Sequence, residues 1–433
     1  MQIVEPKSLA GFIDMLPNEQ IAFNKLKLQI ENSYKKFGFI PLETPVLEYS
    51  SVLLAKAGGE TEKQIYRFTK GDNDVCMRFD LTVPLAKYVA SKCNNITFPF
   101  KRYQIERAYR GERVQKGRFR EFYQCDADII NENELSLSAD AECINMIYTT
   151  LKSIGIDNFK IKINNRKILN GFLENYNIVN DEILRIIDKL EKIGKEKVKE
   201  YLIELEISEE MADKILSLIS YEGSVSETIS YLENLGVSNE TYLKGVKELK
   251  DVCALTNYYN LSEDYYKVSL STVRGLDYYT GTVFETELTN FKEFGSICSG
   301  GRYENLTSFY SSRKFVGVGF SIGLSRLFSQ LCENNLIDLS NFSTAKCVVL
   351  PMDNSVIKYA IDVCSYLRDN NVNTELYLQD KSFKSKLNYA NKMGVPFVII
   401  VGENEVKENK YCLKNMKTGN QVIVDKKELL NNF

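Results

Sequence analysis

The chain has 433 residues, with 55 lysines and arginines against 58 aspartates and glutamates, and it contains no histidine. Without imidazole there is no Ser-His-Asp or Cys-His nucleophile, no histidine general base and no zinc site of the Cys/His or three-His kind. The net charge of −3 and the hydrophobic content of 44% are ordinary for a globular protein of two or three domains, and they weigh weakly for or against a nucleic-acid partner.

The ten cysteines include no C-x-x-C pair, so the sequence predicts reduced thiols and neither a zinc ribbon nor a thioredoxin-type motif. The N-terminal stretch MQIVEPKSLAGFIDMLPNEQ has no basic region followed by an apolar core. No apolar run elsewhere has the length of a membrane-spanning helix. We therefore expect a soluble, cytoplasmic protein without a targeting segment or a membrane partner.

The first part of the chain predicts helices and strands in turn. Apolar residues recur at helical spacing over 17–36, between a proline that suits a first helical position and the stop signal Gly38, and the strand FIPLETPVLE follows. The β-leaning segments 101–112 and 118–130 flank the basic loop VQKG, which is typical of an antiparallel hairpin with a charged tip. A further helix is expected over 136–153.

Between about Lys167 and Tyr258 the strand signal nearly disappears, and leucine, isoleucine, lysine and glutamate dominate. Residues 181–251 contain 17 acidic and 10 basic side chains, a local net charge of −7. A compact helical insertion explains both the periodicity and the interruption of the strands on either side. Its acidity argues against a broad phosphate-binding face there, although one edge remains available to RNA.

Strand patterns resume at Tyr266, in YYTGTVFETEL and GSICSGGRYENL, and VGVGFSIGLSRLFSQL then turns helical. Residues 334–345, rich in Asn, Ser and Asp, predict a linker. Residues 346–433 alternate strands and helices, as expected for a small α/β domain with a mostly parallel sheet, and end in a strand pair and a helix. With 13 basic and 10 acidic residues, this segment is the positive end of the molecule.

Cationic side chains crowd around the turn of the predicted hairpin. They are Arg107, Arg110, Arg113, Lys116, Arg118 and Arg120. A solvated charged loop and a site for an anionic partner are the two interpretations. The returning strand favours the partner, because it adds an aromatic ring, an amide and two carboxylates. These are Phe122, Gln124, Asp126 and Asp128. Guanidinium forks grip phosphate oxygens, rings stack on purines and carboxylates hold amino groups, so the hairpin suits a nucleoside triphosphate beside an amino acid.

The glycines of VGVGFSIG have the spacing G-x-G-x-x-x-G and no βαβ context, so they are not a dinucleotide fingerprint. A nicotinamide enzyme is therefore not expected. No G-x-x-x-x-G-K-[ST] loop occurs, and ATP would have to be bound by side chains.

With these motifs the sequence resembles the histidyl-tRNA synthetase family of class II aminoacyl-tRNA synthetases. RAYRGERVQKGRFREFYQCDADI resembles motif 2 of that class, VGVGFSIGLSRL motif 3, and the helix and strand ending at Pro45 motif 1. MRFDLTVPL resembles the amino-acid-binding strand and turn of the family. RGLDYYTGTVFE and GGRYENL resemble two segments that distinguish histidine enzymes from other class II members, so the resemblance spans nearly the whole chain.

The resemblance implies an α+β fold, with a class II antiparallel-sheet catalytic domain over 1–166 and 259–333 and a helical insertion at 167–258. A linker at 334–345 and an α/β anticodon-binding domain at 346–433 would follow. The implied activity is that of a histidine–tRNA ligase, which forms histidyl-adenylate from histidine and ATP, charges the 3′ end of tRNA(His), and releases AMP and pyrophosphate. Mg²⁺ is expected with ATP, with ligands unassigned and without zinc, and a homodimer is implied.

Residue roles are also implied by the resemblance, position by position. The catalytic residues would be Arg274 and Arg110, against the reacting carboxylate and α-phosphate. ATP would be bound by Arg110, Glu112, Arg118, Phe122 and Arg326. Histidine would be bound by Asp80, Thr82, Gln124, Asp128, Arg274, Tyr278, Tyr279 and Tyr303, with the first three on the α-ammonium and with Asp128 and Tyr279 on the imidazole nitrogens. Gln115 and Arg120 would contact the acceptor end of the tRNA.

The chain departs from the family pattern at several positions. Relatives commonly have Glu-Arg where this chain has Ser325 and Arg326, which leaves open what orients the arginine. Some carry glutamate where this chain has Asp80 and Asp128. Ala10 replaces a basic residue before the glycine of GFIDMLP, so no ligand role is assigned to that segment.

Alternatives stay open at single residues and for the function. Tyr278 and Tyr303 could instead be core aromatics, and packing explains Cys125 and Cys298 better than chemistry does. One other function is a silent paralogue that binds histidine and regulates ATP phosphoribosyltransferase. Such proteins usually lack the RGLDYYTG arginine and the anticodon-binding module, both of which are present here. The second is a class II synthetase for another amino acid.

Overall fold

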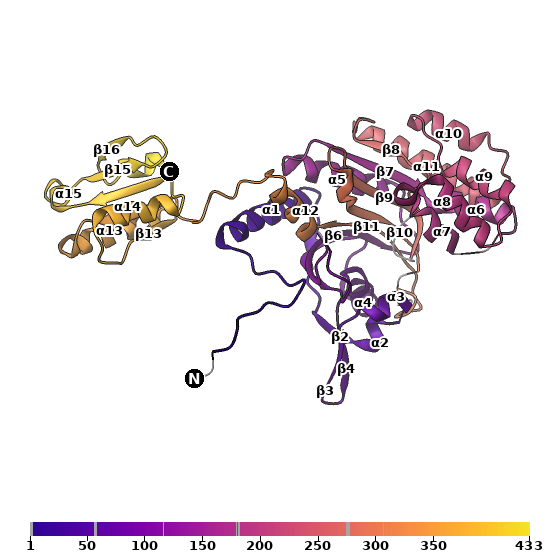
Figure 1. Cartoon of the computed structure of the whole chain (residues 1–433), viewed down its shortest axis with the longest axis horizontal. Coiled ribbons are helices and arrows are strands. Elements are labelled where there is room, and N and C mark those ends of the chain that lie inside the picture. Colours follow the sequence, from indigo (N-terminus) through magenta and orange to yellow (C-terminus); the bar gives the residue numbers. More distant parts are fainter. Residues whose placement is uncertain are drawn as a thin grey trace. The chain divides into compact units, whose positions relative to one another are not determined.

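The computed structural model of the chain describes residues 3–55, 59–115, 117–178, 180, 182–273, 278–305 and 307–433. The chain divides into two compact units (Figure 1). One comprises Met1–Ile13 with Lys27–Gln330, and the other comprises Asp14–Leu26 with Leu331–Phe433. No helix within the described ranges combines the length and the apolar character needed to cross a membrane.

An eight-stranded sheet forms the frame of the first unit, in the order β1-β5-β6-β11-β10-β9-β7-β8. The strands are β1 Ile40–Pro41, β5 Phe100–Tyr109, β6 Glu121–Glu132, β7 Phe159–Asn165, β8 Tyr266–Val268, β9 Tyr279–Leu288, β10 Ser296–Tyr303 and β11 Phe315–Gly323. The pairs β1–β5 and β7–β8 at the two edges are parallel, and all pairs between them are antiparallel. The antiparallel sheet that the family resemblance implied is therefore confirmed for all but the two edge pairs.

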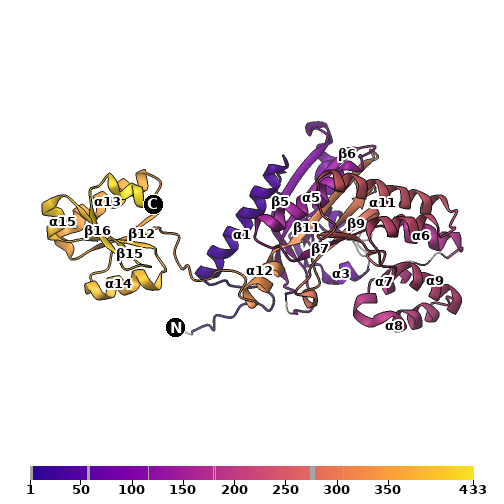
Figure 2. The same cartoon turned by 90° about the horizontal axis from the view of Figure 1, so that it is seen from above.

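The part of α1 (Pro17–Lys36) that belongs to the first unit, from Lys27 onward, and α5 (Ser138–Ser153) pack against one face of this sheet (Figure 2). The hydroxyl of Tyr34 in α1 donates to the carbonyl oxygen of Cys125 at 3.1 Å, and its ring meets that of Phe320 edge-on with centroids 5.7 Å apart. Because side chains alternate along a strand, the neighbours Asp126 and Ser321 project from the opposite face. Asp126 and Ser321 thus lie on a polar face of the sheet.

The connection between β5 and β6 is longer than the predicted loop VQKG. Residues 110–120 lie outside both strands. The Gly111 N–H donates to the carbonyl of Gln64 at 2.6 Å, and the Arg120 N–H donates to that of Gly11 at 2.9 Å. Both acceptors are remote in sequence, so strand propensity alone extended the predicted strands too far into the connection.

A small three-stranded sheet and short helices lie between β1 and β5. They are β2 Leu47–Tyr49, α2 Ser50–Leu53, α3 Gly59–Gln64, β3 Arg67–Lys70, β4 Asn73–Met77 and α4 Thr82–Lys92. The sheet order is β2-β4-β3, with antiparallel pairs. The Val83 N–H donates to Asp80 Oδ1 at 3.1 Å, so a carboxylate caps the start of α4. This places Asp80 and Thr82 together at a helix N-terminus.

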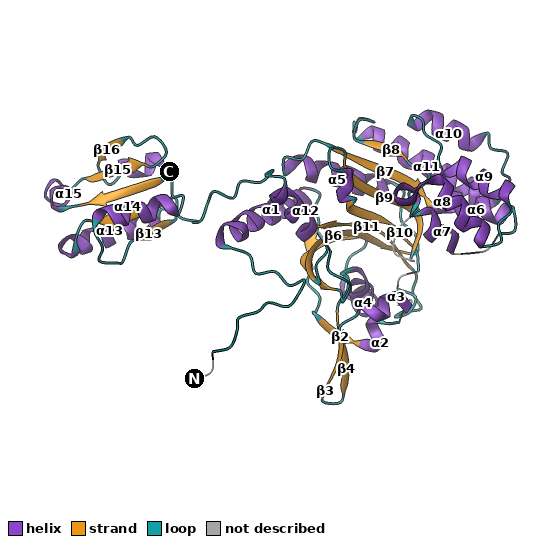
Figure 3. Cartoon of the chain, in the orientation of Figure 1, coloured by secondary structure: helices purple, strands orange, loops and turns teal. Residues whose placement is uncertain are grey.

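The described residues after β7 form six helices, in agreement with the helical segment predicted for this part of the chain (Figure 3). They are α6 Arg166–Asn175, α7 Glu182–Ile187, α8 Leu190–Glu204, α9 Glu209–Ile219, α10 Val225–Glu233 and α11 Glu240–Tyr258. Helices α6 and α11 approach closely at two glycines. A Cβ on Gly171 would lie 2.2 Å from the Tyr242 nitrogen, and one on Gly245 would lie 2.8 Å from the Ile168 nitrogen. Only glycine allows this packing.

The second unit contains the α/β domain predicted for the C-terminal segment. Its elements are β12 Cys347–Pro351, α13 Ile357–Asp369, β13 Thr374–Leu376, α14 Phe383–Lys392, β14 Phe397–Val401, α15 Glu403–Glu408, β15 Tyr411–Asn415 and β16 Gln421–Val424. The sheet order is β13-β12-β14-β15-β16, with β12 parallel to both of its neighbours. Helix α13 buries Val363 and Leu367 on the face of Val349, and α14 buries Ala390 on the face of Val348.

Two helices of this unit differ from the prediction. Helix α15 was not predicted, and the Glu405 side chain stabilises its start by accepting the Gly402 N–H at 2.9 Å. The helix predicted at the very end is a short 3₁₀ segment, Glu428–Asn432, in which Leu429 is fully buried. Such short segments lack the repeated apolar spacing on which helix prediction depends.

Candidate active site

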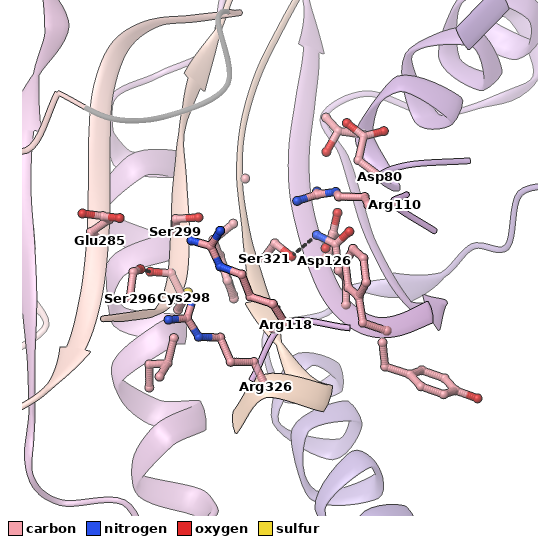
Figure 4. Close-up of a pocket in the computed structure, with 18 of the residues that line it drawn as sticks. Asp80, Arg110, Arg118, Asp126, Glu285, Ser296, Cys298, Ser299, Ser321 and Arg326 are labelled. Carbon is pink, nitrogen blue, oxygen red and sulfur yellow. Dashed lines mark hydrogen bonds between the residues drawn. The ribbon is translucent and has the colours of Figure 1, made fainter. Parts of the chain in front are cut away.

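A cleft of about 510 Å³ opens on the polar face of the eight-stranded sheet (Figure 4), a volume that suits a small-molecule site. Its lining comes from the β5–β6 connection, from strands β6, β9, β10 and β11, from the start of α4 and from α12 (Leu324–Glu333). Twelve of the fifteen predicted site residues line it: Asp80, Thr82, Arg110, Glu112, Arg118, Phe122, Gln124, Asp128, Tyr278, Tyr279, Tyr303 and Arg326. The fold therefore brings together groups that lie up to 246 positions apart in the sequence.

Strand β6 supplies one aromatic ring, one amide and two carboxylates to the cleft. They are Phe122, Gln124, Asp126 and Asp128. These positions are two residues apart, so the pleat of the strand turns all four to the same face. On the neighbouring strand β11, Ser321 lies opposite Asp126 and Gly319 lies opposite Asp128. The Gln124 amide donates to the Ser321 hydroxyl at 2.8 Å, which fixes the position of its carbonyl oxygen.

Two glycines of VGVGFSIG make room for the cleft residues. A Cβ on Gly317 would lie 2.4 Å from the ring of Tyr303, and one on Gly319 would lie 2.1 Å from Asp128 Oδ1. Real side chains do not approach so closely, so neither position accepts alanine without displacing a cleft residue.

Three carboxylates are buried at the bottom of the cleft: Asp80, Asp126 and Asp128 are 2%, 2% and 3% exposed. Beneath them on β5 lies Arg102, which is completely buried and opposite Asp128 in the strand register. Its Nη2 is 2.7 Å from Asp128 Oδ2, and Asp128 Oδ1 accepts the Tyr303 hydroxyl at 2.9 Å. Asp128 is therefore held firmly from two sides.

Burial controls the protonation of these groups. Burial raises the pKa of Asp80 to about 6, although the Val83 N–H and the charge of Arg110 lower it in part. Burial likewise raises the pKa of Asp126 to about 7, although the charge of Arg102 lowers it in part. Burial also raises the pKa of Asp128. One buried guanidinium therefore faces three carboxylates, and this part of the cleft favours a cation.

Tyrosines enclose the carboxylates from the side of β9 and β10. The Tyr278 ring packs edge-on against Tyr279 and Tyr303, with centroids 5.0 and 5.9 Å away. Burial raises the pKa of all three hydroxyls, so they remain protonated hydrogen-bond donors at neutral pH. Tyr278 and Tyr303 are buried in an apolar cluster and also line the cleft, so core packing and cleft lining are combined in both.

Arg110 lies between α4 and β6. Its Nε donates to the carbonyl of Phe79 at 2.9 Å, and its guanidinium carbon is 5.1 Å from the centroid of the Phe122 ring. This arrangement places a cation over an aromatic face and beside Asp80, where a flat ring with a phosphate chain could be held.

Two further arginines line the more exposed part of the cleft. Arg118 Nη1 is 3.8 Å from Glu112 Oε2, and its side chain is 37% exposed. The Arg326 guanidinium donates to the carbonyl of Phe294 in the loop before β10. This contact orients Arg326 in a chain that lacks the preceding glutamate of the family pattern. Ser325, which takes the place of that glutamate, has a different role, because its hydroxyl accepts the Tyr123 N–H at 2.8 Å and joins α12 to β6.

Two of the described residues that were predicted for the site, Gln115 and Arg120, do not line the cleft. Gln115 is exposed at the tip of the connection, where it pairs with Arg118 in an isolated bridge. The Arg120 Nε donates to the carbonyl of Glu112 at 3.1 Å. Arg274 lies outside the described residues, so its predicted role remains a prediction.

Sequence reasoning missed several polar residues of the cleft. These are Gln64, Glu285, Ser296, Ser299 and Ser321. Asp126 was noticed on its strand but given no role, although its spacing from Gln124 and Asp128 already placed it on their face. Cys298 also lines the cleft, and burial raises the pKa of the Cys125 and Cys298 thiols, which agrees with packing roles. Among the described residues, no group of three or more acidic or cysteine side chains is arranged to hold a metal ion.

Comparisons with known proteins agree with the geometry. A family model described as histidyl-tRNA synthetase matches residues 11–327, and one described as an anticodon binding domain matches residues 346–433. A histidine–tRNA ligase of Clostridium tetani is 50% identical over 421 residues, covering 97% of this chain and 96% of that protein. That of Finegoldia magna is 44% identical over 431 residues, with 99% of each covered. A solved histidyl-tRNA synthetase from Nostoc has a TM-score of 0.91 and 35% identity, with both chains covered completely.

Proposed function

The chain belongs to the histidyl-tRNA synthetase family, and we propose that its cleft is the active site of a histidine–tRNA ligase. The enzyme activates histidine with ATP to histidyl-adenylate, transfers the histidyl group to the 3′ end of tRNA(His), and releases AMP and pyrophosphate. The observation that carries this function is the order of groups along the cleft face of β6. The Phe122 ring, which lies under Arg110, is followed along the strand by the amide of Gln124. The buried carboxylates of Asp126 and Asp128 come next and lie beside the tyrosines.

We assign the amino acid to the buried part of the cleft. Asp80, Thr82 and Gln124 hold the α-ammonium, and Asp128 and Tyr279 hold the imidazole nitrogens. Both oxygens of Asp128 already have partners, yet each carboxylate oxygen has a second lone pair with which to accept a ring N–H. A buried pair of partners for the two ring nitrogens rejects amino acids without them, with discrimination of roughly 10⁴-fold or more.

The walls of the amino-acid site are Tyr278 and Tyr303. Tyr303 donates its hydroxyl to Asp128, which keeps that carboxylate facing the ring, and Tyr278 packs edge-on against both Tyr279 and Tyr303. Rotation of the Tyr278 ring would therefore disturb both of the other rings. The tyrosine walls therefore limit the size and shape of the side chain that fits, and Asp128 requires that side chain to donate a hydrogen bond.

We assign ATP to the more exposed part of the cleft. The adenine stacks on Phe122 with Glu112 beside it, Arg110 contacts the α-phosphate, and Arg118 and Arg326 neutralise the β- and γ-phosphates. The support for this order is that Arg110 already lies over the Phe122 ring while the other two guanidinium groups are further out. ATP arrives as its Mg²⁺ complex, and the ion adds to the neutralisation of the phosphate charge.

The first step needs alignment rather than a base. A carboxylate oxygen of histidine attacks the α-phosphorus, and the bond from that phosphorus to the pyrophosphate oxygen breaks. The attacking carboxylate is ionised at neutral pH, so Arg110 and Arg274 act by holding the two anions together and by stabilising the charge of the transition state. In the second step the terminal ribose hydroxyl of tRNA attacks the carbonyl carbon, and a phosphate oxygen of the leaving AMP accepts its proton.

The role of Arg274 is tested by ATP–pyrophosphate exchange. Arg274→Ala should lower kcat/KM for histidine-dependent exchange about 100-fold, because removing one preorganised electrostatic group costs about 3 kcal/mol in the transition state. Arg113→Ala is the matched control, since Arg113 is exposed and does not line the cleft. Exchange in Arg274→Ala that matches the control would refute the assignment.

We also propose the wider organisation that the family implies. Residues 1–166 and 259–333 form the catalytic domain, 167–258 the helical insertion, 334–345 a linker and 346–433 the anticodon-binding domain. Gln115 and Arg120 contact the acceptor end of tRNA, and the enzyme works in the cytoplasm as a homodimer. Gel filtration at the mass of a single chain would contradict the dimer.

A further inference from the structure

Three buried acceptor oxygens in the cleft have no hydrogen-bond partner among the residues that the structure describes. They are Asp80 Oδ2, Gln124 Oε1 and Asp126 Oδ1. Other atoms of Asp80 and Gln124 are fixed, because Asp80 Oδ1 accepts the Val83 N–H and the Gln124 amide nitrogen donates to Ser321. The free oxygens of Asp80 and Gln124 therefore cannot easily turn away to find water. A buried acceptor without a partner is costly, which indicates that a ligand supplies the missing donors.

Asp126 and its neighbour Asp128 differ in whether a cationic side chain pairs with them. Asp128 forms an ion pair with Arg102 at 2.7 Å, whereas the described residues offer Asp126 no cation within ion-pairing distance. Both carboxylates are at least 97% buried. An ionised carboxylate without a partner is strongly disfavoured at such a site, so Asp126 needs either a proton or a cationic ligand.

The number of free acceptors matches one part of the amino-acid substrate. An α-ammonium group has three N–H donors and one positive charge, whereas a neutral imidazole has a single donor. Given the proposed function, on which this step rests, we propose that Asp126 joins Asp80, Thr82 and Gln124 in binding the α-ammonium of histidine. Asp126 thereby selects for a free α-amino group, while Asp128, held by Arg102 and Tyr303, remains the contact of the ring.

This arrangement has a consequence for pH. Burial raises the pKa of Asp126 to about 7, so part of the population is protonated before the ligand arrives. The charged and titratable groups around it are Arg102 on β5, Cys125 and Asp128 on β6, Asp80 before α4, Tyr34 on α1, Tyr279 on β9 and Cys298 on β10. An ammonium favours the ionised carboxylate, so ligands that carry it should release protons on binding and bind more tightly at pH 8 than at pH 6.

Two ligands that share the imidazole ring test the assignment by isothermal titration calorimetry. L-histidinol has the α-ammonium but no carboxylate, and imidazole-4-propionate has the carboxylate but no ammonium. Asp126→Asn keeps the shape of the side chain and removes its charge. It should weaken histidinol binding about 10- to 100-fold, the effect of losing one charge-assisted hydrogen bond, and change imidazole-4-propionate binding less than about 3-fold.

Asp128→Asn is the comparison variant, and it should weaken both ligands because both carry the ring. Equal weakening of the two ligands by Asp126→Asn would instead place Asp126 on the imidazole and overturn the inference, and so would no weakening at all. If Asp126→Asn does not fold, Asp126→Ala takes its place, since it removes the buried charge altogether and should show the same selectivity. Failure of wild-type enzyme to bind histidinol or to exchange pyrophosphate with histidine would instead refute the proposed function.

Discussion

The guanidinium of Arg102 lies 2.7 Å from the carboxylate of Asp128, and both groups are buried beneath the substrate cleft. Removing one partner of such a pair leaves an uncompensated buried charge. We expect Arg102→Leu to lower the free energy of unfolding by about 3–5 kcal/mol at pH 8. The loss should be smaller at pH 5, where the carboxylates of the variant take up protons. Urea denaturation at the two pH values measures both effects.

The control for this variant is an exposed ion pair. Arg67 and Asp74 form a bridge at 2.6 Å with side chains 49% and 45% exposed. Exposed pairs contribute less than about 1 kcal/mol, so Arg67→Leu should have little effect at either pH. Equal losses in Arg102→Leu and Arg67→Leu would show that the buried pair is not a special element of the cleft.

The stability of the ligand-free enzyme should depend on pH through Asp80 and Asp126. Their pKa values are raised by burial to about 6 and about 7, whereas an unfolded aspartate titrates near about 4. The folded state therefore holds more protons between about pH 4 and 7, and its stability falls as the pH rises through that range. From pH 5 to pH 8 we expect the free energy of unfolding to fall by about 2–4 kcal/mol.

Asp126→Asn isolates this contribution. The amide does not ionise, so only the contribution of Asp80 remains, and the fall in stability from pH 5 to pH 8 should be about one third of that of the wild-type enzyme in the same urea titrations. Saturating histidine should also stabilise wild-type enzyme more at pH 8 than at pH 5, because the bound ammonium compensates the ionised carboxylates. A variant with the wild-type pH profile would mean that Asp126 does not titrate in this range.

Gly319 provides a steric test of the amino-acid site. A Cβ there would lie 2.1 Å from Asp128 Oδ1, so Gly319→Ala should displace the carboxylate and raise KM for histidine at least 10-fold with little change in KM for ATP. Gly323→Ala on the same strand is the packing control, because its added Cβ meets nothing closer than 3.8 Å. An unchanged KM for histidine in Gly319→Ala would argue against Asp128 as a ring contact.

Ser325 provides a test at the ATP end. Its hydroxyl accepts the Tyr123 N–H at 2.8 Å, beside Phe122 on β6 and Arg326 on α12. Ser325→Ala should leave that N–H without its acceptor and raise KM for ATP about 5- to 10-fold, with KM for histidine unchanged. Ser325→Thr keeps the hydroxyl and should behave like wild type. The link between α12 and β6 has no role in ATP binding if Ser325→Ala retains the wild-type KM for ATP.

Local patterns in the sequence predicted the catalytic strands, the helical segment and the C-terminal α/β domain, because each has a strong period or a clear boundary signal. The face of β6 was equally predictable, since Phe122, Gln124, Asp126 and Asp128 alternate with apolar or small residues. Arg102 was not predicted. Its pairing with Asp128 depends on the register of two strands 26 residues apart, and no local signal sets that register.

Other features required the three-dimensional structure for the same reason. The roles of Gly317 and Gly319 appear only when Tyr303 and Asp128 are placed against them. In the sequence, Ser325 is recognised only as a replacement of the glutamate common in the family. In the structure, its hydroxyl accepts a hydrogen bond from a backbone N–H 202 positions away. Sequence patterns thus indicated which chemical groups meet in the cleft, whereas long-range contacts determine how they are held.

The most direct test of the central claim is ATP–pyrophosphate exchange by wild-type enzyme with each of the twenty amino acids. Histidine alone should support exchange at a rate well above background, because only its ring pairs with both Asp128 and Tyr279 in the buried part of the cleft. Exchange with another amino acid would indicate a class II synthetase of different specificity. Binding of histidine without exchange would indicate a silent paralogue, and either result would contradict the account.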